Sequence, residues 1–128
     1  MTVATRPMKL VLDTSAILAF TRGSIHVGEP ISEVADEGGV SGLPTLCLAV
    51  AKWMVDDDDR LQVLTEHPDT VVVPAPQDPV ALGTVETSVG NLDASAAVLT
   101  AIDQQAFIIT ARPGLYRGLI DSGPIVEI

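Results

Sequence analysis

Short runs of consecutive apolar residues constrain the fold of this chain more than any other feature. Four of these runs are predicted to be β-strands, and they are Met8–Leu12, Val71–Val73, Phe107–Ile109 and Ile125–Ile128. A weaker candidate lies around Val40. Their apolar residues are continuous, which is typical of parallel strands buried on both faces, whereas half-exposed strands alternate apolar and polar side chains. The pattern therefore favours a parallel sheet that is covered on both sides.

Segments with a helical pattern separate these runs. One of them places Val27, Ile31, Val34 and Ala35 on one face, and we expect its Pro30 to lie in the first turn, where proline is tolerated. The other helices are expected at Thr14–Phe20, from Pro44, from Asp56 through Leu64, at Pro79–Ser88 and at Leu92–Gln105. Strands that alternate with helices predict an α/β fold, with a parallel sheet of four to five strands and helices on both faces. The length of 128 residues fits a single domain over residues 1–128.

The charge of the chain limits its partners. Its formal net charge is −10, it has seven Lys and Arg residues, and only four residues are Phe, Trp or Tyr. Proteins that bind nucleic acid through its phosphates are usually basic, and base stacking needs aromatic rings. RNA is therefore expected to be a weak partner, and a protein partner is favoured. The hydrophobic content of 47% also suggests a homodimer, because some apolar surface can be buried between subunits.

Two further features bear on where the protein works. Cys47 is the only cysteine, so no internal disulfide can form, and a reducing, cytoplasmic setting is expected. The longest uncharged runs are short and broken by Asp, Pro or Gly, so we expect no transmembrane helix and no membrane partner. We also expect no signal peptide, because the apolar run after Lys9 meets Asp13 within three residues.

The ends of the predicted strands point to a candidate site. Sites in open α/β sheets form beyond the carboxyl ends of the strands. There this chain has Asp13-Thr14-Ser15 after its first strand and Thr110-Ala111-Arg112 after a later one. Asp13 is the strongest candidate for chemistry, although an aspartate in front of a helix is also a common N-cap. Asp93 opens another predicted helix, where its charge suits the helix dipole whatever else it does.

Several other kinds of site lack support. The chain has no G-x-G-x-x-G or G-x-x-x-x-G-K-[ST] loop for nucleotide phosphates. His26 and His67 have no second histidine at metal-ligand spacing, and Cys47 is expected to be a small core residue. The acidic run Asp56–Asp59 is interpreted as a solvated first turn of a helix. A phosphorylated receiver domain is excluded, because the third strand does not end in an aspartate and no lysine follows Lys52.

Four segments together resemble a known family. They are Lys9–Ala19 (KLVLDTSAILA), Leu43–Ala49 (LPTLCLA), Leu92–Ala97 (LDASAA) and Ile108–Tyr116 (IITARPGLY). In this order and spacing they resemble PIN domains, especially the VapC-type toxin ribonucleases of toxin–antitoxin systems. The resemblance covers nearly the whole chain and implies a PIN-like parallel sheet and metal-dependent RNA cleavage. It also implies four acidic residues that would hold Mg²⁺ or Mn²⁺, which prefer oxygen ligands.

Only two of the four implied acids are present. Asp13 and Asp93 match the family positions and are the catalytic and metal-binding candidates. Val50 stands where the resemblance implies a Glu in the middle helix, and Arg112 stands where it implies an Asp after the penultimate strand. Val50 is expected to add an apolar wall in place of a ligand. The further pocket residues are expected to be Thr14, Ser15, Thr110 and Arg112.

Arg112 carries the main hypothesis from the sequence. Two carboxylates held close together repel, and the planar guanidinium of an arginine can pair with both. At about 4 Å and an effective dielectric of about 20, each attraction is on the order of 4 kcal/mol before desolvation. We therefore expect Arg112 to replace the metal ion and to tie Asp13 and Asp93 into a salt bridge, with a solvated loop arginine as the alternative. Glu29 or Glu33 could instead complete a metal site.

Two functions follow from these residues. The favoured one is a pseudo-nuclease that keeps the fold, has impaired or lost RNA cleavage, and acts as a binding or regulatory module for an antitoxin-like protein segment. The alternative is an active endoribonuclease of toxin–antitoxin type that uses Mg²⁺ or Mn²⁺ in a reduced metal site. Losing oxygen ligands should weaken Mg²⁺ binding sharply, which favours the pseudo-nuclease.

Overall fold

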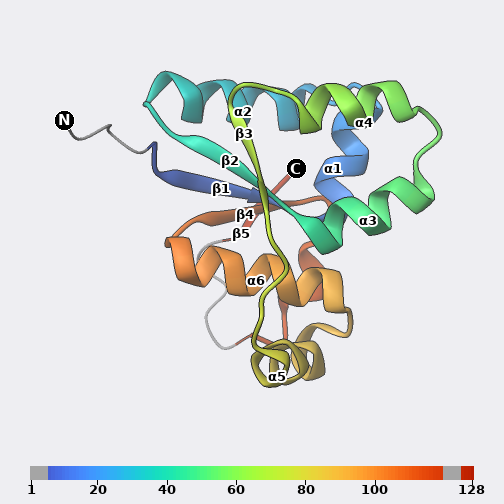
Figure 1. Ribbon diagram of the computed structural model, residues 1–128, viewed down its shortest axis with the longest axis vertical. Coiled ribbons are helices and arrows are strands. Elements are labelled where there is room, and N and C mark those ends of the chain that lie inside the picture. The colour runs from blue at the N-terminus through green and yellow to red at the C-terminus, as the bar shows by residue number, and fades with distance from the viewer. Residues whose placement is uncertain (1–5, 120–124) are drawn as a thin grey trace.

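A single sheet of parallel strands forms the centre of the molecule (Figure 1). The computed structural model describes residues 6–119 and 125–128. Five strands pair in the order β3-β2-β1-β4-β5, and every pairing is parallel. Their bounds are β1 (Met8–Leu12), β2 (Val40–Pro44), β3 (Thr70–Val73), β4 (Phe107–Thr110) and β5 (Ile125–Glu127). All five predicted strand positions are confirmed, the weaker candidate at Val40 included.

Helices cover both faces of this sheet. On one face lie α1 (Thr14–Thr21), α2 (Ile25–Asp36) and α4 (Asp58–Thr65), and on the other lies α6 (Leu92–Gln104), with α5 (Pro79–Val89) packed against its outer side. The helix α3 (Thr45–Met54) contacts both α1 and α6, and η1 (Pro113–Tyr116) is a short 3-10 turn after β4. The predicted α/β fold, with a parallel sheet of four to five strands and helices on both faces, is thus confirmed and is consistent with a PIN-like arrangement.

The central strand β1 positions the site. Val11 and Leu12 are fully buried, because α1 and α6 pack on either side of the strand. The register pairs Leu12 with Ile109 of β4, so Asp13, which follows β1, and Thr110, the last residue of β4, lie together at the carboxyl ends of the two strands. The packing of the core therefore places two polar side chains at the same edge of the sheet.

Two details of the prediction are wrong. Pro30 lies in the interior of α2 and not in its first turn, because the helix already begins at Ile25. The strand β3 is not buried on both faces: Val71 and Val72 are 43% and 42% exposed. This strand is at the end of the sheet order, where only one neighbouring strand and little helix cover it. A continuous apolar run therefore identified the strand but not its place at the edge.

Among residues 6–119 and 125–128, none of the helices combines the length and the apolar character needed to cross a membrane.

Candidate functional site

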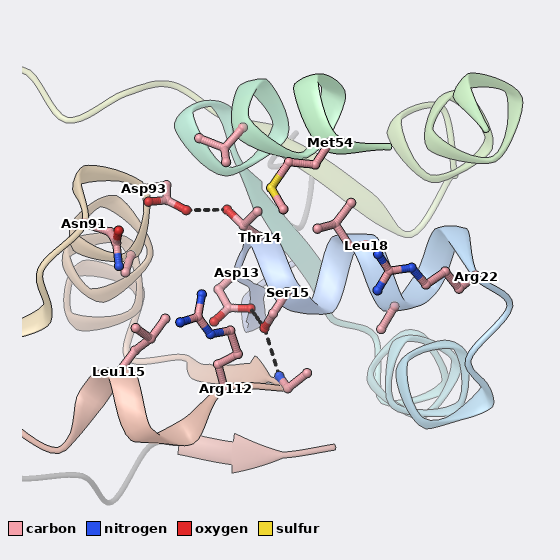
Figure 2. Close-up of a pocket in the computed structure, with 14 residues that line it drawn as sticks. Asp13, Thr14, Ser15, Leu18, Arg22, Met54, Asn91, Asp93, Arg112 and Leu115 are labelled. Atoms are coloured by element: carbon pink, nitrogen blue, oxygen red, sulfur yellow. Dashed lines mark hydrogen bonds between the residues drawn. The ribbon is translucent and has the colours of Figure 1, made fainter. Parts of the chain in front are cut away.

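A pocket of about 450 Å³ opens at the carboxyl edge of the sheet (Figure 2). The end of β1 and the residues after β4 form its floor, and one side of α1, the first turn of α6 and one side of α3 form its walls. The residues of the sequence prediction that line it are Asp13, Thr14, Ser15, Val50, Asp93 and Arg112. The fold thus brings together residues that are up to about a hundred positions apart in the chain, as expected for strand ends in a parallel sheet.

Asp13 is a buried carboxylate whose two oxygens both accept hydrogen bonds. Asp13 is only 2% exposed. The Oδ1 atom accepts from the Ser15 hydroxyl at 2.6 Å and from the backbone N–H of Ala16 at 3.0 Å, and Oδ2 accepts from the Tyr116 hydroxyl at 2.7 Å. Asp13 is thereby the N-cap of α1. These three hydrogen bonds offset the hydration that the carboxylate loses on burial.

Tyr116 was not anticipated as a partner of Asp13. It lies at the end of η1, it is 1% exposed, and its hydroxyl reaches Asp13 across 103 positions of sequence. Burial, and then the nearby Asp13 carboxylate, raise the pKa of Tyr116 far above its ordinary value, so the hydroxyl remains a donor. The sequence signals this contact only in a general way, because the hydroxyl of a buried tyrosine usually forms a hydrogen bond with a polar partner.

Ser15 and Thr110 extend this network to the segment after β4. The backbone N–H of Ala111 donates to Ser15 Oγ at 2.9 Å, and that of Arg112 donates to Thr110 Oγ1 at 2.9 Å. The two hydroxyl oxygens lie 3.2 Å apart. Ser15 has one hydroxyl proton, which points to Asp13, so Thr110 must be the donor between the two hydroxyls. The polar groups therefore form a chain that ends on the Asp13 carboxylate.

Asp93 is less constrained than Asp13. It lies in the first turn of α6 and is partly exposed, and its Oδ2 atom accepts from the Thr14 hydroxyl at 2.6 Å. The Cys47 thiol donates to its backbone carbonyl at 3.2 Å. Burial raises the pKa of Cys47 to about 12, so the thiol is protonated at neutral pH. Cys47 is accordingly the small core residue that the sequence predicts, with no role as a thiolate.

Arg112 does not form the expected salt bridge. Its side chain lines the pocket, but within the described parts of the chain no ion pair joins it to Asp13 or Asp93 within 4.0 Å. Arg112 is exposed, so it is hydrated. Uncharged donors from Ser15, Ala16 and Tyr116 already hydrogen-bond both Asp13 oxygens, so this buried carboxylate does not need Arg112 to offset its lost hydration. The alternative of a solvated loop arginine therefore describes the structure better.

The remaining walls of the pocket are largely apolar. Val50 and Met54 face it from α3, and Leu18 and Leu115 face it from α1 and η1. Sequence reasoning missed Arg22 and Asn91, which also line the pocket and are drawn in Figure 2. Both follow or precede a helix, at the end of α1 and the start of α6, so their neighbours in the chain gave no sign that they would meet here.

The other acids considered from the sequence lie elsewhere. Glu29 and Glu33 line a separate hollow along α2, and Asp103 is exposed at the far end of α6. His26 is exposed, and His67 accepts a hydrogen bond from the backbone N–H of Asp69. None of these residues joins Asp13 and Asp93.

The pocket does not fit a Mg²⁺ or Mn²⁺ ion bound in the way the resemblance implies. In the part of the chain that the structure covers, no group of three or more His, Cys, Asp or Glu side chains is placed to hold a metal. Asp13 has donors on both oxygens, and Val50 supplies a hydrocarbon where a ligand would be needed. Hard cations need several oxygen ligands, and waters alone would have to supply most of them here.

Comparison with known proteins adds no relative. A scan against protein-family models gives no match, and neither does a search of curated proteins.

Proposed function

We propose that this chain is a PIN-like pseudo-nuclease, related in fold to VapC-type toxins, that has lost metal-dependent RNA cleavage and acts as a binding or regulatory module. The observation that carries the proposal is the hydrogen bonding of Asp13, whose two oxygens accept from a hydroxyl, a backbone N–H and a phenol. In this role the aspartate stabilises the start of α1 and the end of η1. The three donors compete with a metal ion for the oxygens of this carboxylate.

The energetic cost of using the pair as metal ligands supports this conclusion. An ion on Asp13 Oδ2 would displace or share the Tyr116 hydroxyl, and an ion on Asp93 Oδ2 would compete with Thr14. Hydrogen bonds to charged groups contribute about 1.5–3 kcal/mol each, so losing two costs about 3–6 kcal/mol. Because each 1.4 kcal/mol is a factor of about ten in affinity, metal binding would be weakened by roughly a hundredfold to ten-thousandfold.

Charge and setting support a protein partner. The net charge of −10 and the few aromatic rings disfavour RNA, so an antitoxin-like protein segment is the partner we propose. A homodimer is also part of the proposal, since large apolar side chains such as Val71 and Val72 are exposed on the edge strand. The single, buried Cys47 agrees with a reducing, cytoplasmic setting.

One observation favours the alternative of an active ribonuclease. The Oδ1 atom of Asp93 has no hydrogen bond to another described residue, and Asp93 lines an open pocket. An ion held mainly by this carboxylate and by waters would give weak Mg²⁺- or Mn²⁺-dependent cleavage.

An RNA-cleavage assay separates the two functions. Highly purified wild-type protein is incubated with single-stranded RNA in Mg²⁺, in Mn²⁺ and in EDTA, next to Asp93→Asn, Asp13→Asn and the control Asp103→Asn. We expect the same background cleavage in all samples. Cleavage that needs the metal, persists in Asp103→Asn and disappears in Asp93→Asn would establish the active enzyme. Asp93→Asn is the decisive variant, because Asp13→Asn also perturbs a helix cap.

A further inference from the structure

A second concave surface runs along α2, away from the pocket at the carboxyl edge. It consists of two adjoining hollows, of about 390 Å³ and about 460 Å³, which share Phe20, Ile25 and Gly28. The opposite wall comes from α4 and the residue His67 beyond it. We call this continuous surface the α2–α4 groove. None of its residues lines the pocket of Figure 2.

One half of the α2–α4 groove is apolar. Ile25 and Val63 are 64% and 58% exposed, and the partly buried Phe20, which packs against the core, lines the same hollow. A methyl group added at Gly28 would meet no atom within 4 Å, so the backbone of α2 leaves open space above this position. Large exposed side chains around an open hollow are the usual signature of a surface that another molecule covers.

The other half of the groove is acidic. Glu29, Glu33 and Asp36 line it with the i, i+4, i+7 spacing of one face of α2. Within the residues described, none of the three carboxylates forms an ion pair or a side-chain hydrogen bond. Like charges at i, i+4 repel and destabilise a helix by about 0.2–0.5 kcal/mol per pair. The chain thus keeps a repulsive stripe next to an apolar hollow.

Among the described residues that line the groove, the one Lys or Arg side chain does not neutralise this stripe. Arg60 lies at the apolar end, and its Nε atom is 3.7 Å from Asp57, so its charge is directed to its own helix. His67 is at the acidic end, and its Nδ1 accepts a hydrogen bond from the backbone N–H of Asp69. The unpaired charge of the groove is therefore negative.

We propose that the α2–α4 groove docks a basic amphipathic helix of a partner protein. The apolar side chains of that helix would pack on Phe20, Ile25 and Val63, and its Lys or Arg side chains would face the stripe of Glu29, Glu33 and Asp36. The stripe spans seven residues, about 10 Å along α2, which matches cations two turns apart on a helix lying alongside. Helix-in-groove recognition uses this combination of apolar anchors and flanking charges. The inference rests on the proposed binding function and gives it a surface and a class of partner.

The test uses a defined peptide as the probe. A dye-labelled peptide of about 18 residues carries Leu at i, i+3, i+4 and i+7 and Lys or Arg beside them, and a scrambled peptide has the same composition. Binding to the full chain is followed by fluorescence anisotropy. We expect saturable binding of the amphipathic peptide, at least roughly tenfold weaker for the scrambled one, and weaker at high salt.

Two pairs of variants locate the binding. The double variant Glu29→Lys/Glu33→Lys reverses the stripe and should weaken binding at least roughly tenfold, because like charges across an interface are strongly unfavourable. Asp103→Lys, one acid-to-lysine change on an exposed residue outside the groove, should leave binding within about twofold. Gly28→Gln fills the hollow and should abolish binding, whereas Gly83→Gln, on a helix with the same open space, should not.

Several results would overturn the inference. These are no saturable binding, equal binding of both peptides, and binding that the stripe and Gly28 variants leave unchanged. A wild-type dimer that Gly28→Gln separates into monomers would also overturn it, because a second copy of the chain would then occupy the groove. Failure of the proposed function is a different result, namely metal-dependent RNA cleavage that the groove variants do not alter.

Discussion

Carboxylates in two regions of this molecule differ in whether the protein itself binds them. In the pocket at the carboxyl edge of the sheet, Asp13 is buried and both of its oxygens accept hydrogen bonds from the protein itself. In the α2–α4 groove, Glu29, Glu33 and Asp36 line an open hollow and pair with nothing in the described chain. An acid at the end of a strand can therefore stabilise the fold, while the acids on an exposed surface helix are the ones available to bind a partner.

Removing the Asp13 carboxylate should have the largest effect on stability. Asp13→Ala leaves the Ser15 hydroxyl, the Ala16 N–H and the Tyr116 hydroxyl without their acceptor in a buried site. Each buried donor without a partner costs about 1–3 kcal/mol, so we expect a loss of about 3–5 kcal/mol in the free energy of unfolding, measured by urea denaturation. The matched control Asp103→Ala should stay within about 0.5 kcal/mol, because its carboxylate is exposed. Equal effects of the two changes would contradict the difference between the regions.

Tyr116→Phe should have a smaller effect in the same direction. It removes one of the three donors to Asp13 and keeps the aromatic ring in the core. We expect a loss of about 1–3 kcal/mol, the usual cost when a hydrogen bond to a buried charged group is removed. Combining it with Asp13→Ala should cost less than the sum of the two changes, because both act on one contact. Additive losses would show that the two side chains act independently.

The pH dependence of stability should report the same contact. The pKa of Tyr116 is raised in the folded protein, first by burial and then by Asp13. Its contribution is therefore fully present below the unfolded pKa of about 10. Above that pH the unfolded chain releases the proton and the folded chain does not, so stability should fall by up to about 1.4 kcal/mol per pH unit.

The variant Tyr116→Phe supplies the control for this measurement. It should lack this part of the decline, while Cys47, whose pKa is raised to about 12 by burial, still contributes its own loss above pH 9 in both proteins. Identical slopes above pH 10 for the wild type and the variant would count against a buried phenol bonded to Asp13.

Neutralising the groove should barely change stability. Glu29→Gln and Glu33→Gln remove a repulsion between carboxylates that make no ion pair in the described chain, so we expect a change within about 0.5 kcal/mol, in the stabilising direction. Thermal unfolding of both single variants and the double variant measures it. A loss above about 1 kcal/mol would mean that these carboxylates hold the fold together, and the distinction between the two regions would disappear.

The sequence predicted the sheet well because its signal is local. Apolar runs such as Met8–Leu12 mark strands wherever they lie in the sheet, and the helical patterns between them fix the α/β class. The same signal could not place β3 at the edge, because Val71 and Val72 look alike in an edge strand and in a central one. The sequence also could not place Pro30 in the interior of α2, because whether a helix tolerates an internal proline depends on the surrounding structure.

The site was only partly predictable. Asp13 and Arg112 meet in one pocket because each follows the carboxyl end of a strand in the parallel sheet, and Asp93 joins them from the first turn of α6. The pairing of Asp13 with Tyr116 spans 103 positions and has no local signal. The expected salt bridge with Arg112 does not form. That prediction considered only the attraction between charges and not the uncharged groups that hydrogen-bond Asp13. The groove was not predicted at all, since its walls come from the end of α1, from α2 and from α4.

The central claim, that Asp13 is held by protein donors and does not ligate metal, can be tested in one crystal experiment. Crystals are grown in excess Mn²⁺, and anomalous scattering is collected at the manganese edge. We predict no anomalous peak between Asp13 and Asp93, with Ser15 and Tyr116 still hydrogen-bonded to the Asp13 carboxylate. A manganese ion bound to a carboxylate oxygen of Asp13, with the Tyr116 hydroxyl displaced, would contradict the account.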